Sequence, residues 1–330
     1  MDQLHRGARR LASLAIIAGL PTIGIERGHG TASPTMPSNA GPSSLAEWCP
    51  AAPATAEPFV PALADSGKIY RGTFGPAGDE FWFFKKVSPD PHAEDYRIFV
   101  SRRGASGWSP AARVGLGGEF SDLYPTLSRD GRRLVFTSYR RAPGDTASTP
   151  SAGLWSAERT ATGWSDPVFL ATATRLGAYH SHPTLGRDGR LFFHRTSPDW
   201  DTTTTMVAAP DGNGFATPVP YEPVERWRGW REDRFVWGGM PSPDTSFILL
   251  EVSPQVAGER GQRPSDLWVS FREPAGWSEP APLGGGVNTD RGWENFAAVT
   301  PDGCSLIFVR DFSGFFRVSL QAALPAHQTP

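Results

Sequence analysis

The sequence has little net charge and few cysteines. Its formal charge is −2 over 330 residues, so it offers no strong basic field, and we expect no nucleic-acid partner. It contains neither a glycine-rich phosphate loop nor the Gly-x-Ser-x-Gly turn of serine hydrolases. The sequence therefore lacks the local motifs of two large enzyme classes.

Long apolar runs are also missing, apart from Leu11–Ile25. A basic segment, Met1–Arg10, precedes this run, and a basic start before a short apolar core is typical of a secretory signal. The run is shorter than the roughly 20 residues needed to span a bilayer. We predict a signal peptide or N-terminal anchor over residues 1–27. The rest should be exported to the periplasm or beyond the cell, with no membrane span in the mature chain. Residues 28–52, rich in Gly, Ser, Thr and Pro, are predicted to be a disordered spacer.

One unit recurs along the rest of the chain, and Asp122–Leu170 shows it most clearly. An apolar run, an Asp-Gly turn, the β-forming run Leu134–Phe136 and two further runs follow one another. Four short antiparallel strands joined by tight turns make one blade of a β-propeller. Five copies of the turn, separated by 53, 58, 56 and 58 residues, carry Ala77, Asp130, Asp188, Asp244 and Asp302. We predict an all-β propeller of five four-stranded blades, with six blades as the alternative.

The last blade lacks its fourth strand at the end of the chain. Four fourth strands are recognised, starting at Gly107, Gly163, Gly214 and Gly276. Near the beginning, Ala56–Leu63 is similar to Ser278–Leu283. Because an open blade edge would leave backbone groups unpaired, Glu57–Leu63 is predicted to complete the last blade and close the ring. A Pro-rich linker is the alternative for this segment. The propeller domain is then 53–320, followed by a tail, 321–330.

Three runs resemble the TolB-like propeller repeat, with its Ser-Pro-Asp-Gly turn and Asp-Leu-Trp strand: TLSRDGRRLVFTSYR, VTPDGCSLIFV and SDLWVSFREPAGWSEPAPL. The resemblance covers about Glu57–Leu320. It implies a propeller, usually of six blades in that family, and no particular function. Some copies depart from the turn pattern: Ala77 replaces Asp, Thr245 replaces Gly, and Gly186-Arg187 replaces Ser-Pro.

The two cysteines fit the predicted closure. An exported chain meets an oxidising compartment. Cys304 follows the turn of the last blade, and Cys49 stands eight residues before Glu57. In a four-stranded blade, the first-to-second turn lies on the face where the closing strand begins. We therefore predict a Cys49–Cys304 disulfide that pins the ring shut, with two free thiols as the alternative.

Loop lengths distinguish the two faces of the predicted ring. First-to-second and third-to-fourth turns are short, whereas second-to-third loops such as Tyr139–Ala152 and blade-to-blade connections such as Tyr221–Arg234 are long. Long loops on a rigid scaffold are where binding groups concentrate. We call the side with the long loops the funnel face and the opposite side the turn face, and predict that ligands bind at the funnel face.

Candidate binding residues come from the starts of the innermost strands and from the connections. A period of two puts His180 and His182 on one face, with His194 nearby. Three histidines could hold a divalent metal, and no other cofactor is indicated. A polar channel lining is the alternative. The predicted funnel-face set is Arg71, Asp122, Tyr179, His180, His182, Trp227, Arg228, Trp230, Arg234, Trp293, Glu294 and Asn295.

Two classes of function fit these residues. The first is an exported, monomeric, noncatalytic module that binds a protein, cell-wall or glycan ligand, and we favour it. Glu225–Gly239, rich in Arg and Trp, suits acidic groups and sugars, or else packs its Trp residues against the rim. The second is a carbohydrate-active enzyme. Asp122 and Glu294 could serve a carboxylate-based glycoside hydrolase. The His180–His182 pair with the Arg cluster distantly resembles oligogalacturonate lyases, which implies a metal-dependent uronate lyase.

Overall fold

The computed structural model describes residues 52–60, 69–90, 95–147, 151–199, 202–255 and 264–326. The chain divides into two compact units, Met1–Ser43 and Ser44–Pro330, and the described residues all belong to the second. The predicted signal or anchor, nearly all of the spacer and the last four residues of the tail lie outside the described residues. Neither helix of the described residues is long and apolar enough to cross a membrane.

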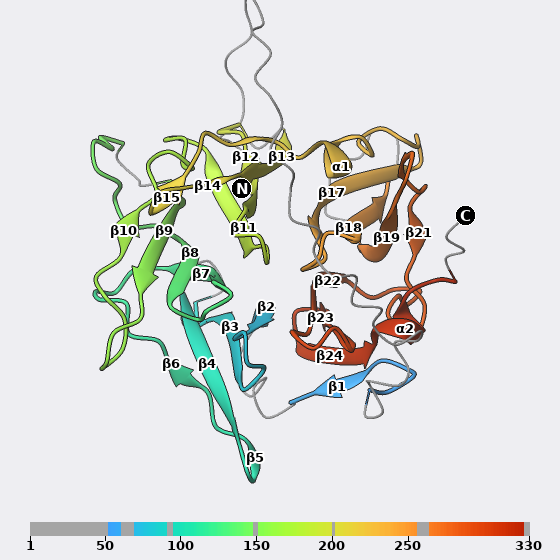
Figure 1. Ribbon diagram of the computed structural model, residues 1–330, viewed down its shortest axis with the longest axis horizontal. Coiled ribbons are helices and arrows are strands. Elements are labelled where there is room, and N and C mark those ends of the chain that lie inside the picture. The colour runs from blue at the N-terminus through green and yellow to red at the C-terminus, as the bar shows by residue number, and fades with distance from the viewer. Residues whose placement is uncertain are drawn as a thin grey trace, which may run out of the picture. The chain divides into compact units, whose positions relative to one another are not determined.

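The described part of Ser44–Pro330 is almost entirely β-structure, in five antiparallel sheets around a common centre (Figure 1). Four sheets take their strands in chain order from the centre outward, and the fifth does so except that its outermost strand comes from the start of the domain. This is the arrangement of propeller blades. The five-bladed all-β propeller predicted from the repeats is confirmed. The innermost strands are β2 (Ile69–Phe74), β7 (Asp122–Leu127), β11 (Tyr179–Leu185), β17 (Arg234–Pro241) and β22 (Glu294–Val299).

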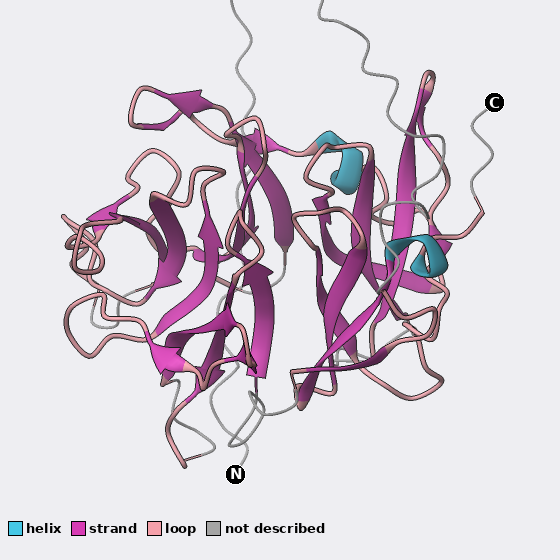
Figure 2. Cartoon of the chain, turned by 60° about the horizontal axis from the view of Figure 1, so that its bottom comes forward, coloured by secondary structure: helices cyan, strands magenta, loops and turns pink. Residues whose placement is uncertain are grey.

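The remaining strands lie outside the innermost ones in each blade. Figure 2 shows that strands make up nearly all of the regular structure, with only short helices beside them. The second strands are β3 (Glu80–Lys86), β8 (Arg133–Ser138), β12 (Leu191–Thr196), β18 (Phe247–Pro254) and β23 (Ser305–Arg310). The third strands are β4 (Tyr96–Gly104), β9 (Gly153–Glu158), β13 (Thr203–Ala208), β19 (Asp266–Glu273) and β24 (Gly314–Ser319). The fourth strands are β6 (Ala112–Arg113), β10 (Val168–Phe169), β16 (Val219–Pro220), β21 (Ala281–Pro282) and β1 (Glu57–Phe59). There are also two short helices, α1 (Glu222–Glu225) and α2 (Leu320–Ala323), and four two-residue strands outside this scheme.

The fourth strands begin a few residues after the glycines at which the sequence analysis placed their starts. In blades 1 and 4 the Gly-Trp pairs at these glycines form β5 (Gly107–Trp108) and β20 (Gly276–Trp277), which only extend the hairpin of the third strand. The equivalent segment of blade 3 is the small hairpin of β14 (Pro210–Asp211) and β15 (Gly214–Phe215). A proline follows each pair and has no N–H to donate, so regular pairing resumes only after it.

The ring is closed by β1, as the sequence predicts. Its three residues pair antiparallel with β24, placing Glu57 opposite Arg317 and Phe59 opposite Phe315. The strand ends at Phe59, and Val60 after it takes a φ of 46°, outside the extended conformation. Residues 61–63 of the predicted Glu57–Leu63 lie outside the described residues. The last blade is therefore built from both ends of the domain.

The same tight turn joins the first two strands of all five blades. Its closing N–H···O=C bond measures 2.8 to 3.0 Å in each blade, from Gly78 to Gly75, and likewise at Gly131, Gly189, Thr245 and Gly303. Ala77 does not disturb the turn, and Thr245 adopts the positive φ of 59° that glycine takes elsewhere. The departures from the repeat therefore leave the backbone of the turn unchanged.

The core lies between neighbouring blades. Trp82 and Phe84 of β3 pack with Leu123 and Phe136 of blade 2, and Leu267 of β19 packs in the cluster that contains Phe308. Phe136 and Phe308 have no accessible surface. The second strand of each blade is covered on both faces by neighbouring blades, so its sequence is a nearly continuous apolar run.

A β-bulge interrupts every innermost strand, at the same repeat position in four blades and one residue earlier in blade 4. The pairing shifts by one residue after Tyr70, Leu123, Ser181, Val236 and Asn295. In three blades a residue of the bulge has positive φ: Tyr124 at 52°, His182 at 56° and Phe296 at 56°. A bulge re-aims the side chain it carries. The alternation of faces expected from a regular strand is therefore broken at the centre of the propeller.

Candidate functional site

The three re-aimed side chains meet at the centre. The rings of Tyr124 and His182 lie 4.3 Å apart between centroids, and His182 stacks on Phe296 at 5.2 Å. Tyr124 and Phe296 are 6.3 Å apart. A non-glycine residue at positive φ costs on the order of 1–3 kcal/mol unless its surroundings hold it there. Contacts among the three rings, one stacked, one tilted and one edge-on, supply that support.

Arg71 is a buried cation next to this layer. Its Nη2 donates to Oγ1 of Thr184, whereas Nε and Nη1 have no partner among the described residues. Burial lowers the pKa of Arg71 to about 10, against the attraction of Glu251. Glu251 accepts a hydrogen bond from the Phe296 backbone N–H at 2.8 Å, and burial raises its pKa. The guanidinium thus keeps two unused donors inside the ring.

His194 of β12 packs against His182, with 4.6 Å between ring centroids. Gly238 of β17 makes room for it, because a Cβ on Gly238 would lie 2.5 Å from Cε1 and Nε2 of His194. Burial lowers the pKa of His194 to about 3 and holds the pKa of His182 well below its usual value. Both imidazoles are therefore neutral at pH 7.

Acidification should destabilise the fold through His194. Its folded pKa of about 3 is below the unfolded value, so the unfolded state binds the extra proton as the pH falls below about 6.5. One such group should remove about 2 kcal/mol of unfolding free energy between pH 7 and pH 5. Urea unfolding of the wild type and His194→Gln at both pH values measures this. An equally steep pH dependence in the variant would contradict a buried, neutral His194.

His180 does not join this pair. Its Nε2 accepts the backbone N–H of Arg175 and its Nδ1 donates to the carbonyl of Ala152, both at 3.1 Å. Within the described ranges, no group of three His, Cys, Asp or Glu side chains is suited to hold a metal ion. The three-histidine site predicted from His180, His182 and His194 is therefore not formed. The bulge separates the faces of His180 and His182.

The two acidic candidates are structural. Asp122 forms a buried ion pair with Arg140, which also donates to the carbonyls of Leu116 and Gly117 at 2.8 and 2.9 Å. Glu294 is fully buried, and its Oε1 lies 3.0 Å from Nε of Arg310. Each pair ties an innermost strand to the preceding connection. Neither carboxylate is available as the sequence interpretation required.

Three further predicted residues pack at the funnel-face ends of the innermost strands. The half-buried ring of Tyr179 lies 6.3 Å from that of Tyr139. Trp293, also half-buried, lies 6.0 Å from Phe312. Asn295 is buried and accepts a hydrogen bond from Ser265 at 3.1 Å. These contacts give each residue a role in packing.

The Arg- and Trp-rich segment packs against the outer part of blade 4. Trp230 lies 6.1 Å from Trp227 and 5.8 Å from Trp268 between centroids, and its Nε1 donates to Glu279. The arginines are also engaged. Arg228 pairs with Glu225 at 2.6 Å, and Arg234 pairs with Asp233 at 3.4 Å. Packing of the Trp residues against the rim, the alternative interpretation, therefore describes this segment.

Cys304, in the turn of the last blade, is disulfide-bonded. Cys49, the other cysteine of the sequence, lies outside the described residues. The predicted pairing of Cys49 with Cys304 stays a prediction.

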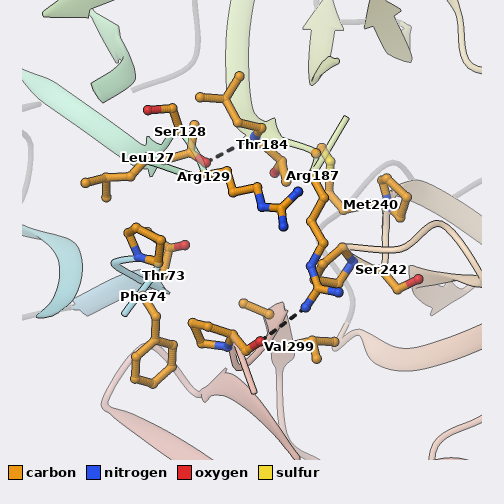
Figure 3. A pocket seen from close by; sticks show the side chains of 18 of the residues that line it. Thr73, Phe74, Leu127, Ser128, Arg129, Thr184, Arg187, Met240, Ser242 and Val299 are labelled. Carbon is orange, nitrogen blue, oxygen red and sulfur yellow. Dashed lines mark hydrogen bonds between the residues drawn. The ribbon is translucent and has the colours of Figure 1, made fainter. Parts of the chain in front are cut away.

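A pocket of about 490 Å³ opens at the centre of the turn face (Figure 3). All five blades line it, through the ends of their innermost strands and the turns that follow. Blades 1 to 3 place Thr73, Thr126 and Thr184 at equivalent repeat positions. Blades 4 and 5 have Met240 and Ala298 there instead. The pocket therefore has a hydroxyl-rich side and an apolar side.

Two arginines extend into this pocket from neighbouring blades. Figure 3 shows the side chains of Arg129 and Arg187 pointing into the open space. Arg187 of blade 3 donates to the carbonyl of Pro301 in blade 5 at 3.2 Å, and so reaches across the pocket. None of the described residues that line the pocket is acidic. The polar side is consequently cationic.

Several solved structures are similar to the chain. One is the Agrobacterium tumefaciens protein described as "putative TolB", at 13% identity and a TM-score of 0.42, covering 78% of this chain and 76% of that one. Trypanosoma rangeli sialidase in complex with the inhibitor DANA is 10% identical, with a TM-score of 0.45 and coverage of 77% and 55%. Puromycin hydrolase is 18% identical, with a TM-score of 0.41 and coverage of 84% and 42%.

The chain thus spans about half of the sialidase and less than half of the puromycin hydrolase. No protein-family model matches the sequence, and the comparison with curated proteins finds no match. Identities below 20% with TM-scores below 0.5 do not assign the chain to a family. The propeller fold stands on the strand pairing described above.

The arginines of the pocket were missed because they lie on the turn face. Their signal was present in the sequence. Blades 1, 4 and 5 carry Pro76, Pro243 and Pro301 at the turn position where blades 2 and 3 carry Arg129 and Arg187. Proline is favoured at this second position of a type I turn. Arginine instead of proline at this position in two adjacent blades is not explained by the stability of the turn. It indicates a role for the two side chains outside the turn.

Proposed function

We propose that the propeller is a noncatalytic ligand-binding module whose site is the central pocket of the turn face. The observation that carries this proposal is the joint lining of one pocket by all five blades, with the side chains of Arg129 and Arg187 extending into it. A pocket of this size suits a small molecule or the end of a larger ligand. This site replaces the funnel face that loop lengths suggested.

Binding without turnover is the better reading of the side chains. Glycoside hydrolysis needs two carboxyl groups across the scissile bond. Asp122 and Glu294 are held in buried ion pairs, and the described lining of the pocket contains no carboxyl group. The proposed module therefore holds its ligand and returns it unchanged.

Export to the periplasm or the exterior belongs to the same proposal. Disulfides persist in oxidising compartments, and Cys304 is disulfide-bonded. The signal peptide and the monomeric state stay predictions.

Methyl NMR can test the site directly. The chain has four methionines; Met240 lines the pocket, whereas Met206 is buried between blades. With [methyl-13C]Met in the full chain, a panel of glycans, cell-wall fragments, peptides and small acids should include ligands that shift Met240 and leave Met206 in place. Met240→Leu and Met206→Leu assign the two signals. Recovery of the ligand intact would support binding without turnover, and a panel that never moves Met240 would contradict the site.

A further inference from the structure

The charge of the central pocket comes from one side only. Arg129 and Arg187 occupy the same position of the turn in blades 2 and 3. The described residues give Arg129 no hydrogen bond or ion pair, and Arg187 uses only its bond to the carbonyl of Pro301. Most of the guanidinium donors at the pocket therefore remain available.

The aspartates that follow these arginines in the turns, Asp130 and Asp188, form no ion pair with them. Oδ1 of Asp130 accepts hydrogen bonds from Ser128 and from the backbone N–H of Arg132, at 2.5 and 3.0 Å. Asp188 pairs with Arg190 at 2.5 Å. Both carboxylates are thus engaged within their own turns.

A third arginine lies beneath the pocket wall. Arg71 is only 5% exposed, and its guanidinium donates to Thr184, a residue of the lining. Its Nε and Nη1 have no partner among the described residues. The buried carboxylate of Glu251 attracts this cation, so the guanidinium groups that the pocket itself leaves unpaired are those of Arg129 and Arg187.

The opposite side of the pocket is mainly apolar, and the hydroxyl of Ser242 there donates to Asp244. Met240, Leu249, Ala298 and Val299 of blades 4 and 5 face the arginine side. Because apolar surface and guanidinium groups share one cavity, the best ligand combines an anionic head with an apolar body.

We propose that the pocket binds an amphipathic anion, with a carboxylate or phosphate group held by Arg129 and Arg187 and an apolar body packed against blades 4 and 5. This inference rests on the proposed function. Arginine forms two parallel hydrogen bonds with either head group. The two head groups are therefore distinguished by experiment.

Replacing each arginine by proline separates binding from folding. The backbone N–H groups of Arg129 and Arg187 make no hydrogen bond in the described structure, and three of the five turns already carry proline. Arg129→Pro and Arg187→Pro should therefore keep or raise the Tm. Each should weaken octanoate binding about tenfold, the equivalent of one charge-assisted hydrogen bond. Arg132→Ala removes the same charge from an exposed site outside the pocket and should leave affinity unchanged.

The probes are butyrate, hexanoate, octanoate, octyl phosphate, 1-octanol and inorganic phosphate, titrated against the Met240 methyl signal with Met206 as the internal reference. Affinity should rise about fourfold per buried methylene from butyrate to octanoate. Octanol and inorganic phosphate should bind much more weakly than octanoate or octyl phosphate. The relative affinities of these two identify the preferred head group.

Other results would overturn the inference. Octanol binding as tightly as octanoate, with no loss in the proline variants, would mean a merely apolar pocket. Inorganic phosphate binding as tightly as octyl phosphate would mean an anion site that ignores the body. If none of these probes shifts Met240 but a ligand of the broader panel does, the inference falls and the proposed function stands. If nothing shifts Met240, both fall.

Discussion

Deleting residues 1–64, and with them β1, should abolish cooperative folding. Without β1 the outer edge of β24 loses its pairing, because Glu57 and Phe59 form the ends of that ladder. Phe59 also joins the last blade to the first, with its ring 5.3 Å from Phe81 and 5.9 Å from Trp108. Loss of both contacts opens the ring at the only junction where its blades are not consecutive in sequence. Thermal unfolding followed by near-UV circular dichroism should show no sharp transition.

Two controls separate β1 from the other segments removed. Deleting 1–45 keeps β1 and both cysteines, and should leave the Tm unchanged. The double variant Cys49→Ser and Cys304→Ser keeps β1 and tests the disulfide alone; its loss should cost about 2–4 kcal/mol and preserve cooperativity. A sharp transition at the wild-type Tm after removal of 1–64 would show that closure does not depend on β1.

Glu294→Ala should destabilise the domain by about 3–5 kcal/mol, because it leaves a largely buried cation without its partner. The carboxylate has no accessible surface, and its Oε1 accepts hydrogen bonds from Arg310 at 3.0 Å and from Thr289 at 2.8 Å. Arg310 in turn donates to the carbonyls of Gly286 and Val287, so the pair holds the connection between blades 4 and 5. Urea unfolding measures the loss.

The double variant Glu294→Ala and Arg310→Met identifies the cause. Removing both charges should cost less than the sum of the single changes, since neither is left unpaired. Asp290→Ala removes an exposed acid from the same connection and should change stability by no more than about 0.5 kcal/mol. If Glu294→Ala lowers the unfolding free energy no more than Asp290→Ala does, the ion pair is not structural. Glu294 would then again be a candidate for ligand binding.

The fold could be predicted because its signals are local. An Asp-Gly turn shapes its own backbone, and a strand buried on both faces is apolar throughout, so each repeat can be recognised from its own residues. Closure was predictable for a similar reason. The segment around Glu57 is similar to a fourth strand, and the last blade lacked one. The turn of the backbone at Val60 was not predictable, because no residue there signals a positive φ.

The site depended on interactions between blades. A one-residue bulge in each innermost strand re-aims Tyr124 and His182, and this breaks the period of two from which His180 and His182 were paired. Spacing along the chain also could not show that Asp122 and Glu294 would meet arginines, since those partners lie on the next strand or beyond it.

By itself, the sequence determined that the chain forms blades, because turn formation and apolar burial act over a few residues. It favoured five blades and closure by the segment at Glu57, and the strand pairing then decided both against the alternatives. The sequence also shows arginine at positions 129 and 187, where the other three turns have proline. Only the tertiary structure decided that these two side chains enter one pocket. Five strand ends, separated by more than fifty residues from one blade to the next, line one cavity only when the ring has closed around it.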